Sequence, residues 1–573
     1  MNILLSDRRS SQLLLFCASL SFSSVLLEEL GLRLSWLWVW LLVFICWRYA
    51  SLKSGKAFSR QNQSLNQSLN QPQSWETLAI FAILCFAGYH LLFYFFEING
   101  QFSIKNPNLY GDLPFHLEQI RYLEKLDHFW PDNPIFFADH LRYSFGINWL
   151  TALFLRAQLP MGFVLTVSSF VFLYLLVSEL WNWFGLWGVL AFFGSGGGWG
   201  YTYRDQMRFW QPGPEIAWKN LFLAVFVTQR GFWFALPAGI LILRMMFRHF
   251  STSEGLTNRQ KKIVTFIWAI LPFFHLHSFV LLTAVITFLC YVSSGAAIFY
   301  YFVRRSWIPA FFIFHSVGAG NVQRTLRFVT NWMSESDPLW LSWIKNFGLW
   351  AFLPVAGIVL AWRFVPRSDY RRPMIIFSVV SFVFFSHMML APWSWDQIKI
   401  ILWLYLILTA LVASLLAEVA RSWWFALLMV SFYMPGLMQF WGGHPAFLSN
   451  QVIWSSEDAQ AARQLVSDIP PMEGILIAPV HNHPLFAAGQ PVVAGYMGHL
   501  WSHGIDVGGL EDAEKAKILG KKIDDPRWQK MKVKYLLWGP EERKWLNLQE
   551  PPAEAQWIKL KSIDAQSLYY HSL

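Results

Sequence analysis

The stretch Tyr110-Gly111-Asp112-Leu113-Pro114-Phe115-His116 follows an apolar run at residues 75–96. An acidic residue so close to a membrane-length apolar run is uncommon, because a charge is costly to place near hydrocarbon. Asp112 has two interpretations. It is either the N-cap of a helix whose first turn contains a proline, or an acid held at the boundary between water and membrane. This stretch alone leaves both interpretations open.

The residues after Asp112 predict a helix from Phe115 to Phe129. Apolar side chains recur there at roughly helical spacing: Phe115, Leu117, Ile120, Leu123 and Leu126. We expect this helix to lie along the membrane surface with one apolar edge facing the lipid. An acid in that position would meet a lipid-borne substrate that never leaves the bilayer.

The composition is that of a membrane protein. Of 573 residues, 55% are hydrophobic and only 14% are charged, whereas a soluble protein carries about a quarter charged residues. Repeated apolar stretches of about 15–25 residues predict a polytopic α-helical membrane protein. The net charge of +10 comes mostly from short loops between these stretches, so we expect no nucleic-acid partner. All four cysteines lie inside apolar runs, so the sequence indicates no disulfide framework.

The apolar runs predict about thirteen transmembrane helices. They lie near residues 11–27, 34–50, 75–96, 161–181, 184–195, 221–247, 263–277, 278–303, 306–320, 346–364, 373–390, 400–418 and 422–440. Arginine and lysine follow alternate runs, which places residues 51–74 in the cytoplasm and the first outer loop, residues 97–160, outside. The first run ends without a small-residue cleavage site, so we expect it to be retained rather than removed as a signal peptide.

The chain divides by composition into two predicted domains. Residues 1–440 form the transmembrane domain, and residues 441–573 have no membrane-length run. In this second part, short β-like runs alternate with helical ones, which predicts a soluble α/β domain on the outer face. The expected strands are Ile475–Val480, Val492–Tyr496 and Tyr535–Trp538, and the expected helices are Asp458–Val466, Leu510–Lys522 and Pro540–Leu546.

Polar residues at the outer ends of the predicted spans suit sugar transfer from a lipid phosphate. A carboxylate such as Asp112 can take the proton from an acceptor hydroxyl. A cation such as Arg230 or Lys399 can stabilise the departing phosphate. Each has a structural alternative: Arg230 as an interface anchor, and Asp396 with Lys399 as a simple ion pair at i and i+3.

The histidines and glycines also allow two interpretations. His275 and His277 lie roughly 200° apart on a helix, so they face one ligand only if the helix breaks near Pro272. The tail histidines are spaced as zinc ligands could be, but no cysteine joins them, which favours histidines without a metal; they are His481, His483, His499 and His503. The glycine-rich run at residues 194–200 is either a flexible loop or a site of close ligand approach.

The architecture, together with Gly111-Asp112 and His116 in the first outer loop, resembles the GT-C superfamily of integral-membrane glycosyltransferases. This superfamily includes mannosyl-, aminoarabinosyl- and oligosaccharyl-transferases. Other short motifs look like those of a bacterial branch: Gln229-Arg230, His275-Leu276-His277-Ser278, Trp395-Asp396-Gln397-Ile398-Lys399, Gly495-Tyr496 and Leu500-Trp501-Ser502-His503-Gly504. The resemblance covers most of the chain.

The resemblance implies a glycosyltransferase of the cell (inner) membrane with a polyprenyl-phosphate-sugar donor and a lipid, glycan or protein acceptor. It implies Asp112 and His116 as catalytic residues, and Arg230 and Lys399 as ligands of the donor phosphate. It implies further substrate contacts at Asp139, Arg142, Tyr143, Arg204, His275, His277, Trp395 and Asp396. Oligosaccharyltransferases also carry acidic motifs that bind a divalent metal, but the second outer loop here offers only Asp205, so a metal ion stays an open question.

Two other functions are compatible with the sequence. A transporter or lipid flippase also has many spans and intramembrane polar groups, but such proteins usually contain internal repeats, and the two halves of this chain show no convincing repeat. The second of these functions is that of a catalytically inactive relative that acts as a scaffold. The long first outer loop and the predicted outer domain favour the enzyme.

Overall fold

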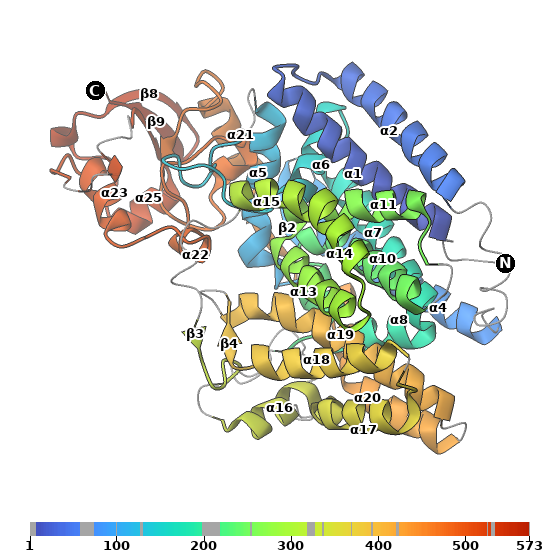
Figure 1. Cartoon of the computed structure of the whole chain (residues 1–573). Coiled ribbons are helices and arrows are strands. Elements are labelled where there is room, and N and C mark those ends of the chain that lie inside the picture. The colour runs from blue at the N-terminus through green and yellow to red at the C-terminus, as the bar shows by residue number, and fades with distance from the viewer. Residues whose placement is uncertain are drawn as a thin grey trace.

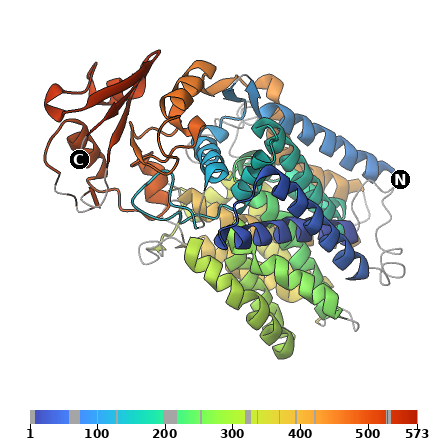
Figure 2. The same cartoon turned by 90° about the horizontal axis from the view of Figure 1, so that it is seen from above.

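The computed structural model describes residues 7–57, 74–98, 100–126, 130–196, 218–251, 255–317, 327–334, 337–367, 369–390, 394–419, 423–523, 525, 527–528 and 533–571. These residues are mostly helical. Figure 1 shows a helix bundle with the C-terminal segment at one end, while the N-terminus lies at the other end. The view from above in Figure 2 shows the same separation.

Six helical stretches of the described residues are long and apolar enough to cross a membrane. They contain α1 (Asp7–Glu29), α4 (Ser74–Tyr94), α7 (Met161–Phe184), α10 (Gly231–Ser251), α16 (Leu339–Phe347) with α17 (Leu353–Phe364), and α19 (Ser394–Val419). A shorter apolar helix is α13 (Leu276–Val292). The protein is therefore a helical membrane protein.

The other helices of the bundle are shorter or less apolar. They are α2 (Trp36–Ala57), α5 (Leu109–Lys125), α6 (Gly146–Arg156), α8 (Leu186–Phe193), the π-helical turn η1 (Phe222–Phe226), α11 (Asn258–Ala269), α12 (Leu271–Phe274), α14 (Ala296–Phe302), the π-helical turn η2 (Val303–Trp307), α15 (Ile308–Val317), α18 (Arg371–Phe385) and α20 (Trp423–Gly442). The predicted span at 184–195 is the eight-residue helix α8, preceded by Gly185 with φ of 62°.

The chain between residues 258 and 317 forms four helical stretches whose boundaries differ from the prediction. Pro272 lies in the first turn of the short α12, and extended backbone at His275 (φ −160°) ends this helix, so α13 starts at Leu276. The helices α14, η2 and α15 follow one another without a gap from Ala296 to Val317. Arg304 and Arg305, which lie between the predicted spans 278–303 and 306–320, belong to the π-helical turn inside this helix.

The predicted surface helix after Asp112 is a buried helix. The helix α5 begins at Leu109 and ends at Lys125, so it starts six residues before the predicted Phe115, and Phe129 lies outside the described residues. Side chains around most of its circumference are buried. It packs against α6 and against the 3-10 helix η6 (Pro484–Ala488) of the C-terminal segment. The expectation of one apolar edge on the lipid was therefore wrong.

A small sheet joins the first outer loop to the C-terminal segment. The strands β1 (Phe95–Ile98) and β2 (Gln101–Ile104) form a hairpin directly after α4. The second edge of β2 pairs antiparallel with β5 (Gln451–Trp454). Two other strands, β3 (Arg327–Phe328) and β4 (Met388–Met389), form a separate pair. Residues that are far apart in the sequence thus share one sheet beside the bundle.

The C-terminal segment carries a second sheet, with strand order β6-β7-β9-β8. The strands are β6 (Ile475–Leu476), β7 (Tyr535–Trp538), β8 (Ile558–Ile563) and β9 (Gln566–Tyr570), and the helices of the segment are α21 (Ser456–Leu465), α22 (Met497–Ser502), α23 (Leu510–Ile518) and α25 (Pro540–Leu546). The bounds of β7 and α25 are those predicted. The run Val492–Tyr496 forms only isolated bridges, at Val492 and Ala494, and the β8–β9 hairpin was not predicted.

One buried amide holds the irregular backbone near η1. Asn220 Nδ2 donates to the carbonyls of Phe193, Ser195 and Gly436, at 2.7 to 3.0 Å. A Cβ atom on Gly196, whose φ is 95°, would lie 2.3 Å from the Asn220 nitrogen. The close approach at Gly196 is therefore to the protein's own backbone, and residues 197–200 of the glycine-rich run lie outside the described residues.

Candidate functional site

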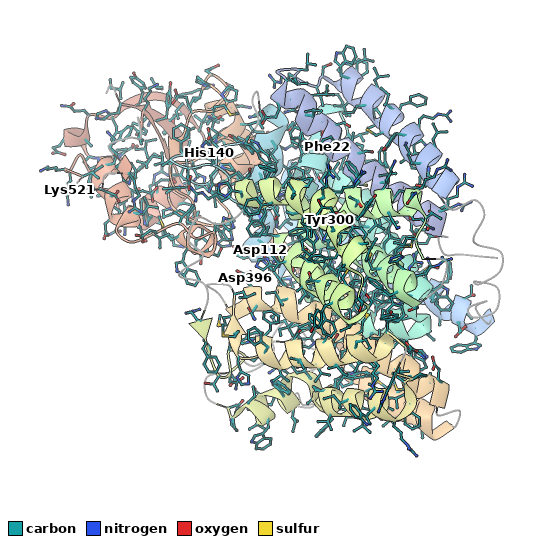
Figure 3. All side chains as sticks on the ribbon, viewed as in Figure 1. Phe22, Asp112, His140, Tyr300, Asp396 and Lys521 are labelled. Atoms are coloured by element: carbon teal, nitrogen blue, oxygen red, sulfur yellow. The ribbon has the colours of Figure 1, made fainter. Side chains whose placement is uncertain are left out.

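A cavity of about 420 Å³ lies where the bundle meets the C-terminal segment. Its walls come from α5, the chain between α5 and α6, η1 and the turn after it, α12, α13, α15, α19 and α22. Polar lining residues are Asn108, Asp112, His116, Arg142, Tyr143, Ser144, Lys219, Thr228, Gln229, His275, His277, Asp396, Lys399, His499, Ser502 and His503. Figure 3 shows Asp112 and Asp396 at the same end of the bundle, next to the C-terminal segment.

Asp112 does not cap α5. The N-cap is Asn108, with no side-chain capping bond, and Asp112 lies inside the first turn. Its Oδ2 accepts a hydrogen bond of 2.7 Å from Gln229 Nε2, on the turn after η1. Its Oδ1 lies 3.9 Å from His499 Nε2 in α22. The carboxylate is 41% exposed, so a ligand in the cavity can reach it.

The surroundings of Asp112 favour a carboxyl group that gains a proton more easily than a free aspartate. Limited contact with bulk water raises the pKa of Asp112, because it disfavours the charged form. The positive charge of Lys399 and the hydrogen bond from Gln229 act against this rise, while the negative charge of Asp396 adds to it. A raised pKa is the usual requirement for a carboxylate that accepts a proton.

Asp396 and Lys399 form an ion pair on the first turn of α19, with 2.7 Å between Oδ1 and Nζ. Gln397 fixes this turn: its Nε2 donates to the carbonyls of Phe385 and Met388, and its Oε1 accepts from the Leu390 nitrogen. The ion pair is thus present, as one interpretation expected, and it also lines the cavity. The backbone of Trp395 belongs to α19, but its side chain lies outside the described residues.

The histidines of the cavity are uncharged hydrogen-bonding groups. Burial lowers the pKa of His116 well below its usual value, and that of His499 to about 4. His116 Nδ1 accepts a hydrogen bond of 3.0 Å from Asn148 Nδ2. The proton of the neutral ring is therefore on its other nitrogen, Nε2. The backbone break at His275 brings His275 and His277 into the same lining, with 5.7 Å between their ring centroids.

Tyr143 and Arg142 line the cavity, but Asp139 does not. Arg142 Nη2 lies 3.2 Å from Asp139 Oδ1, so Asp139 holds the Arg142 side chain in place from outside the cavity. The Tyr143 ring packs on His503 with 4.9 Å between centroids. Burial raises the pKa of Tyr143 to about 12, so its hydroxyl stays protonated at neutral pH.

Arg230 is absent from the residues that line the cavity. Its side chain is 1% exposed, its Nη2 donates to Thr151 Oγ1 at 2.8 Å, and its guanidinium lies over the Trp233 ring. Its neighbour Gln229 lines the cavity instead. This placement gives no support to the expectation that Arg230 contacts the donor phosphate. Arg204 and Asp205 lie outside the described residues.

Sequence reasoning missed the residues that α22 contributes. His499, Ser502 and His503 enter the cavity from the C-terminal segment, more than three hundred residues after Asp112. The sequence signals were the motif from Leu500 to Gly504, which gave no role to these residues, and the spacing of the tail histidines, which was considered only as a zinc site. His483, considered beside them as a zinc ligand, is paired instead with Glu542 at 3.0 Å.

Within the described residues, no three histidine, cysteine or acidic side chains lie close enough together to hold a metal ion. Asp205, the acid that the sequence offered for a metal, lies among residues 197–217, outside the described residues.

The sequence matches no known protein-family model, and no curated protein matches it. Among solved structures, the chain is similar to the archaeal oligosaccharyltransferase AglB from Archaeoglobus fulgidus, solved in complex with an inhibitory peptide and a dolichol-phosphate. The match covers 81% of this chain and 69% of that chain, with 12% identity and a TM-score of 0.38. Because this TM-score is low, the functional conclusions below rest on the cavity residues.

The hydrogen bond from Gln229 gives a prediction about Asp112. In the Gln229→Leu variant, the Asp112 carboxylate loses a donor that stabilises its charged form, so its pKa should rise further. A carbodiimide modifies only the protonated carboxyl, and mass spectrometry of the peptide then measures its labelling against pH. We expect the labelling midpoint to move to higher pH, and no movement in the control Gln460→Leu, an exposed amide of α21. An unchanged midpoint in Gln229→Leu would contradict the prediction.

Proposed function

We propose that this protein is a GT-C-type glycosyltransferase that moves a sugar from a polyprenyl-phosphate donor to an acceptor hydroxyl of a lipid, glycan or protein. One observation carries the proposal: the carboxylate of Asp112 and the ammonium of Lys399 line the same cavity, and the charge of Lys399 acts on Asp112. A base and a phosphate-binding cation in one cavity are what this transfer requires.

The chemistry assigns a separate role to each group. Asp112 takes the proton of the acceptor hydroxyl while the hydroxyl oxygen bonds to the anomeric carbon. The bond from that carbon to the phosphate oxygen breaks, and its electron pair stays on the phosphate. Lys399, held by Asp396 at 2.7 Å, stabilises this new charge. Neutral His116 and the rings of His275, His277 and Tyr143 contact the sugar and the acceptor by hydrogen bonds and packing.

The proposal includes an orientation in the membrane. Residues 1–440 form a transmembrane domain of about thirteen spans, and residues 441–573 form a soluble domain outside the cell (inner) membrane. The basic residues that follow alternate spans support this orientation. The cavity lies beside the C-terminal segment, which supports a reaction on the outer side, where Asp112 would meet the lipid-linked donor.

The orientation predicts which positions a membrane-impermeant thiol reagent labels in intact cells. Ser467→Cys, exposed after α21, should be labelled from outside. Asn258→Cys, exposed at the start of α11, should be labelled only after the cells are opened. The native protein measures the background from its own four cysteines. Labelling of Asn258→Cys but not Ser467→Cys in intact cells would reverse the orientation.

The role of Asp112 as a base predicts the effect of removing its charge. Asp112→Asn keeps an oxygen that can accept the Gln229 hydrogen bond, so thermal stability should stay close to that of the native protein. Transfer of sugar from a polyprenyl-phosphate donor should fall by at least about a hundredfold, because loss of a proton-transfer group costs about 10²–10⁴ in rate. Asp112→Glu should retain little activity, since the extra methylene displaces the carboxylate.

The matched control is Asp132→Asn, which changes an acid of the same loop that does not line the cavity. It should transfer sugar at the native rate. A folded Asp112→Asn variant with native activity would refute Asp112 as the base. Movement of the lipid across the membrane without any sugar transfer, by the native protein, would instead favour a transporter or flippase.

The role of Lys399 predicts a loss of catalytic efficiency toward the phosphate donor. Lys399→Gln should lower kcat/KM by about 10- to 100-fold, since a hydrogen bond to a charged group contributes about 1.5–3 kcal/mol. Lys399→Gln leaves the Asp396 carboxylate unpaired. The double variant Lys399→Gln with Asp396→Asn also removes that carboxylate and should show a similar loss of kcat/KM. Arg230→Lys, outside the lining, should lower thermal stability but leave the KM for the donor unchanged. Native kcat/KM in both Lys399 variants would remove Lys399 from the phosphate site.

A further inference from the structure

A second pocket, of about 570 Å³, lies apart from the cavity of Asp112. It is formed by the connection between α1 and α2, the C-terminal ends of α5 and α6, and the parts of the C-terminal segment around α21 and η6. None of its lining residues lines the first cavity. Five of them are cations: Arg33, Arg121, Lys125, Arg156 and Arg463.

The carboxylates around this pocket do not balance its cations. Glu28 is paired with Arg156 at 2.5 Å, and Arg156 also donates to carbonyls at the end of α5. Glu124 and Glu97 lie 3.0 and 3.9 Å from Arg121. Three carboxylates thus face five cations, an excess of two positive charges. Among the described residues, Lys125, Arg463 and Arg33 form no ion pair, although the charge of Glu124 acts on Lys125 and the charges of Glu97 and Glu124 act on Arg463.

Lys125 and Arg463 are held in place by backbone carbonyls. Lys125 Nζ donates to the Ala488 carbonyl at 2.6 Å, and Arg463 Nε donates to the Ala487 carbonyl at 3.2 Å. These bonds satisfy the last backbone carbonyls of η6, which explains why cations lie there. They use one donor of each side chain, whereas an ammonium has three donors and a guanidinium five. Both side chains line the pocket, and within the described part of the chain their other donors have no partner.

The cations also repel one another. Burial lowers the pKa of Lys125, and the positive charges of Arg121 and Arg463 add to this effect, while the negative charge of Glu124 opposes it. Arg121 Nε is buried and has no hydrogen-bond partner within the described part of the chain. A buried donor without a partner is costly. An anion in the pocket would relieve the repulsion and accept the unused N–H groups.

The pocket opens at the start of α2, a helix with many exposed apolar side chains. The residues from Arg33 to Trp36 belong to its wall, and Trp36 is the first residue of α2. Large apolar side chains of α2 are exposed, including Trp36 at 56% and Phe44 at 61%. Figure 1 shows α2 at the edge of the bundle. Tryptophan is common at the membrane–water interface, which is the depth of lipid headgroups.

We propose that this pocket binds the phosphate group of an anionic membrane lipid at the outer membrane interface. Guanidinium and ammonium groups together suit a phosphate, the first by paired hydrogen bonds and the second as a point charge. An excess of cations is unexpected on the outer face, where the positive-inside rule predicts few, so orientation in the membrane does not explain it. The site does not depend on the activity proposed for the first cavity.

The test measures lipid retained by the full-length protein in native mass spectrometry from a neutral detergent. The probes are phosphatidylglycerol, phosphatidylcholine with the same acyl chains, and inorganic phosphate. The variant is Lys125→Gln with Arg463→Gln, because glutamine removes the charge but keeps an N–H donor for the η6 carbonyls. We expect it to retain at least about tenfold less phosphatidylglycerol than the native protein, the loss of one or more contacts to a charged group.

Two control variants separate the pocket from general charge and from folding. Lys521→Gln with Lys544→Gln removes the same charge from exposed positions of the C-terminal segment and should retain phosphatidylglycerol as the native protein does. Lys125→Arg with Arg463→Lys keeps both charges and should also retain it. Phosphatidylcholine, whose choline offsets the phosphate charge, should be retained less by the native protein.

Inorganic phosphate distinguishes the two sources of the ligand. Displacement of phosphatidylglycerol by millimolar phosphate supports a site that recognises the phosphate of a lipid. A second result would uphold the phosphate site but make its ligand a soluble phosphate. In that result inorganic phosphate stabilises the native protein, Lys125→Gln with Arg463→Gln loses this stabilisation, and no lipid is retained. Equal phosphatidylglycerol retention by this variant and the native protein overturns the proposal.

Discussion

Buried side-chain amides take the place of water at the irregular ends of helices in this bundle, and the cavity depends on them. Inside a membrane domain, every backbone N–H and carbonyl that a helix does not satisfy needs a partner within the protein. Asn220 supplies partners for three carbonyls near η1, and Gln397 does so for the chain that leads into α19. The first thereby positions the turn that carries Gln229, and the second positions Asp396 and Lys399.

The charges in the cavity come from few groups, although many polar residues line it. Burial keeps His116, His499 and His503 neutral at physiological pH. The charges that remain are those of Asp112, Asp396, Lys399, Arg142 and Lys219. The opposite charges of Asp112 and Lys399 each stabilise the charged form of the other. This balance suits a base that must be ionised before the reaction yet basic enough to accept a proton. The neutral rings then determine the shape of the cavity and its hydrogen-bonding pattern.

Local sequence patterns predicted the elements of this protein better than the directions of its side chains. The apolar runs gave the helical membrane class, and the bounds of β7 and α25 followed from propensity alone. Asp112 and Lys399 stood out because charges are rare in apolar surroundings. Arg230 was misplaced because successive residues of a turn point in different directions, so the cavity received Gln229 instead. No local pattern could bring His499 to Asp112, since that contact depends on tertiary packing.

The pairing of β2 with β5 sets an order of events during biosynthesis. About 350 residues separate the two strands, so at about 5–20 residues per second β2 waits roughly 20 to 70 s for its partner. During this time one edge of β2 is open to other chains, which is a known route to aggregation. The hairpin with β1 protects the other edge. Because α22 follows β5 in the chain, a nascent chain lacks a complete cavity until its last quarter has emerged.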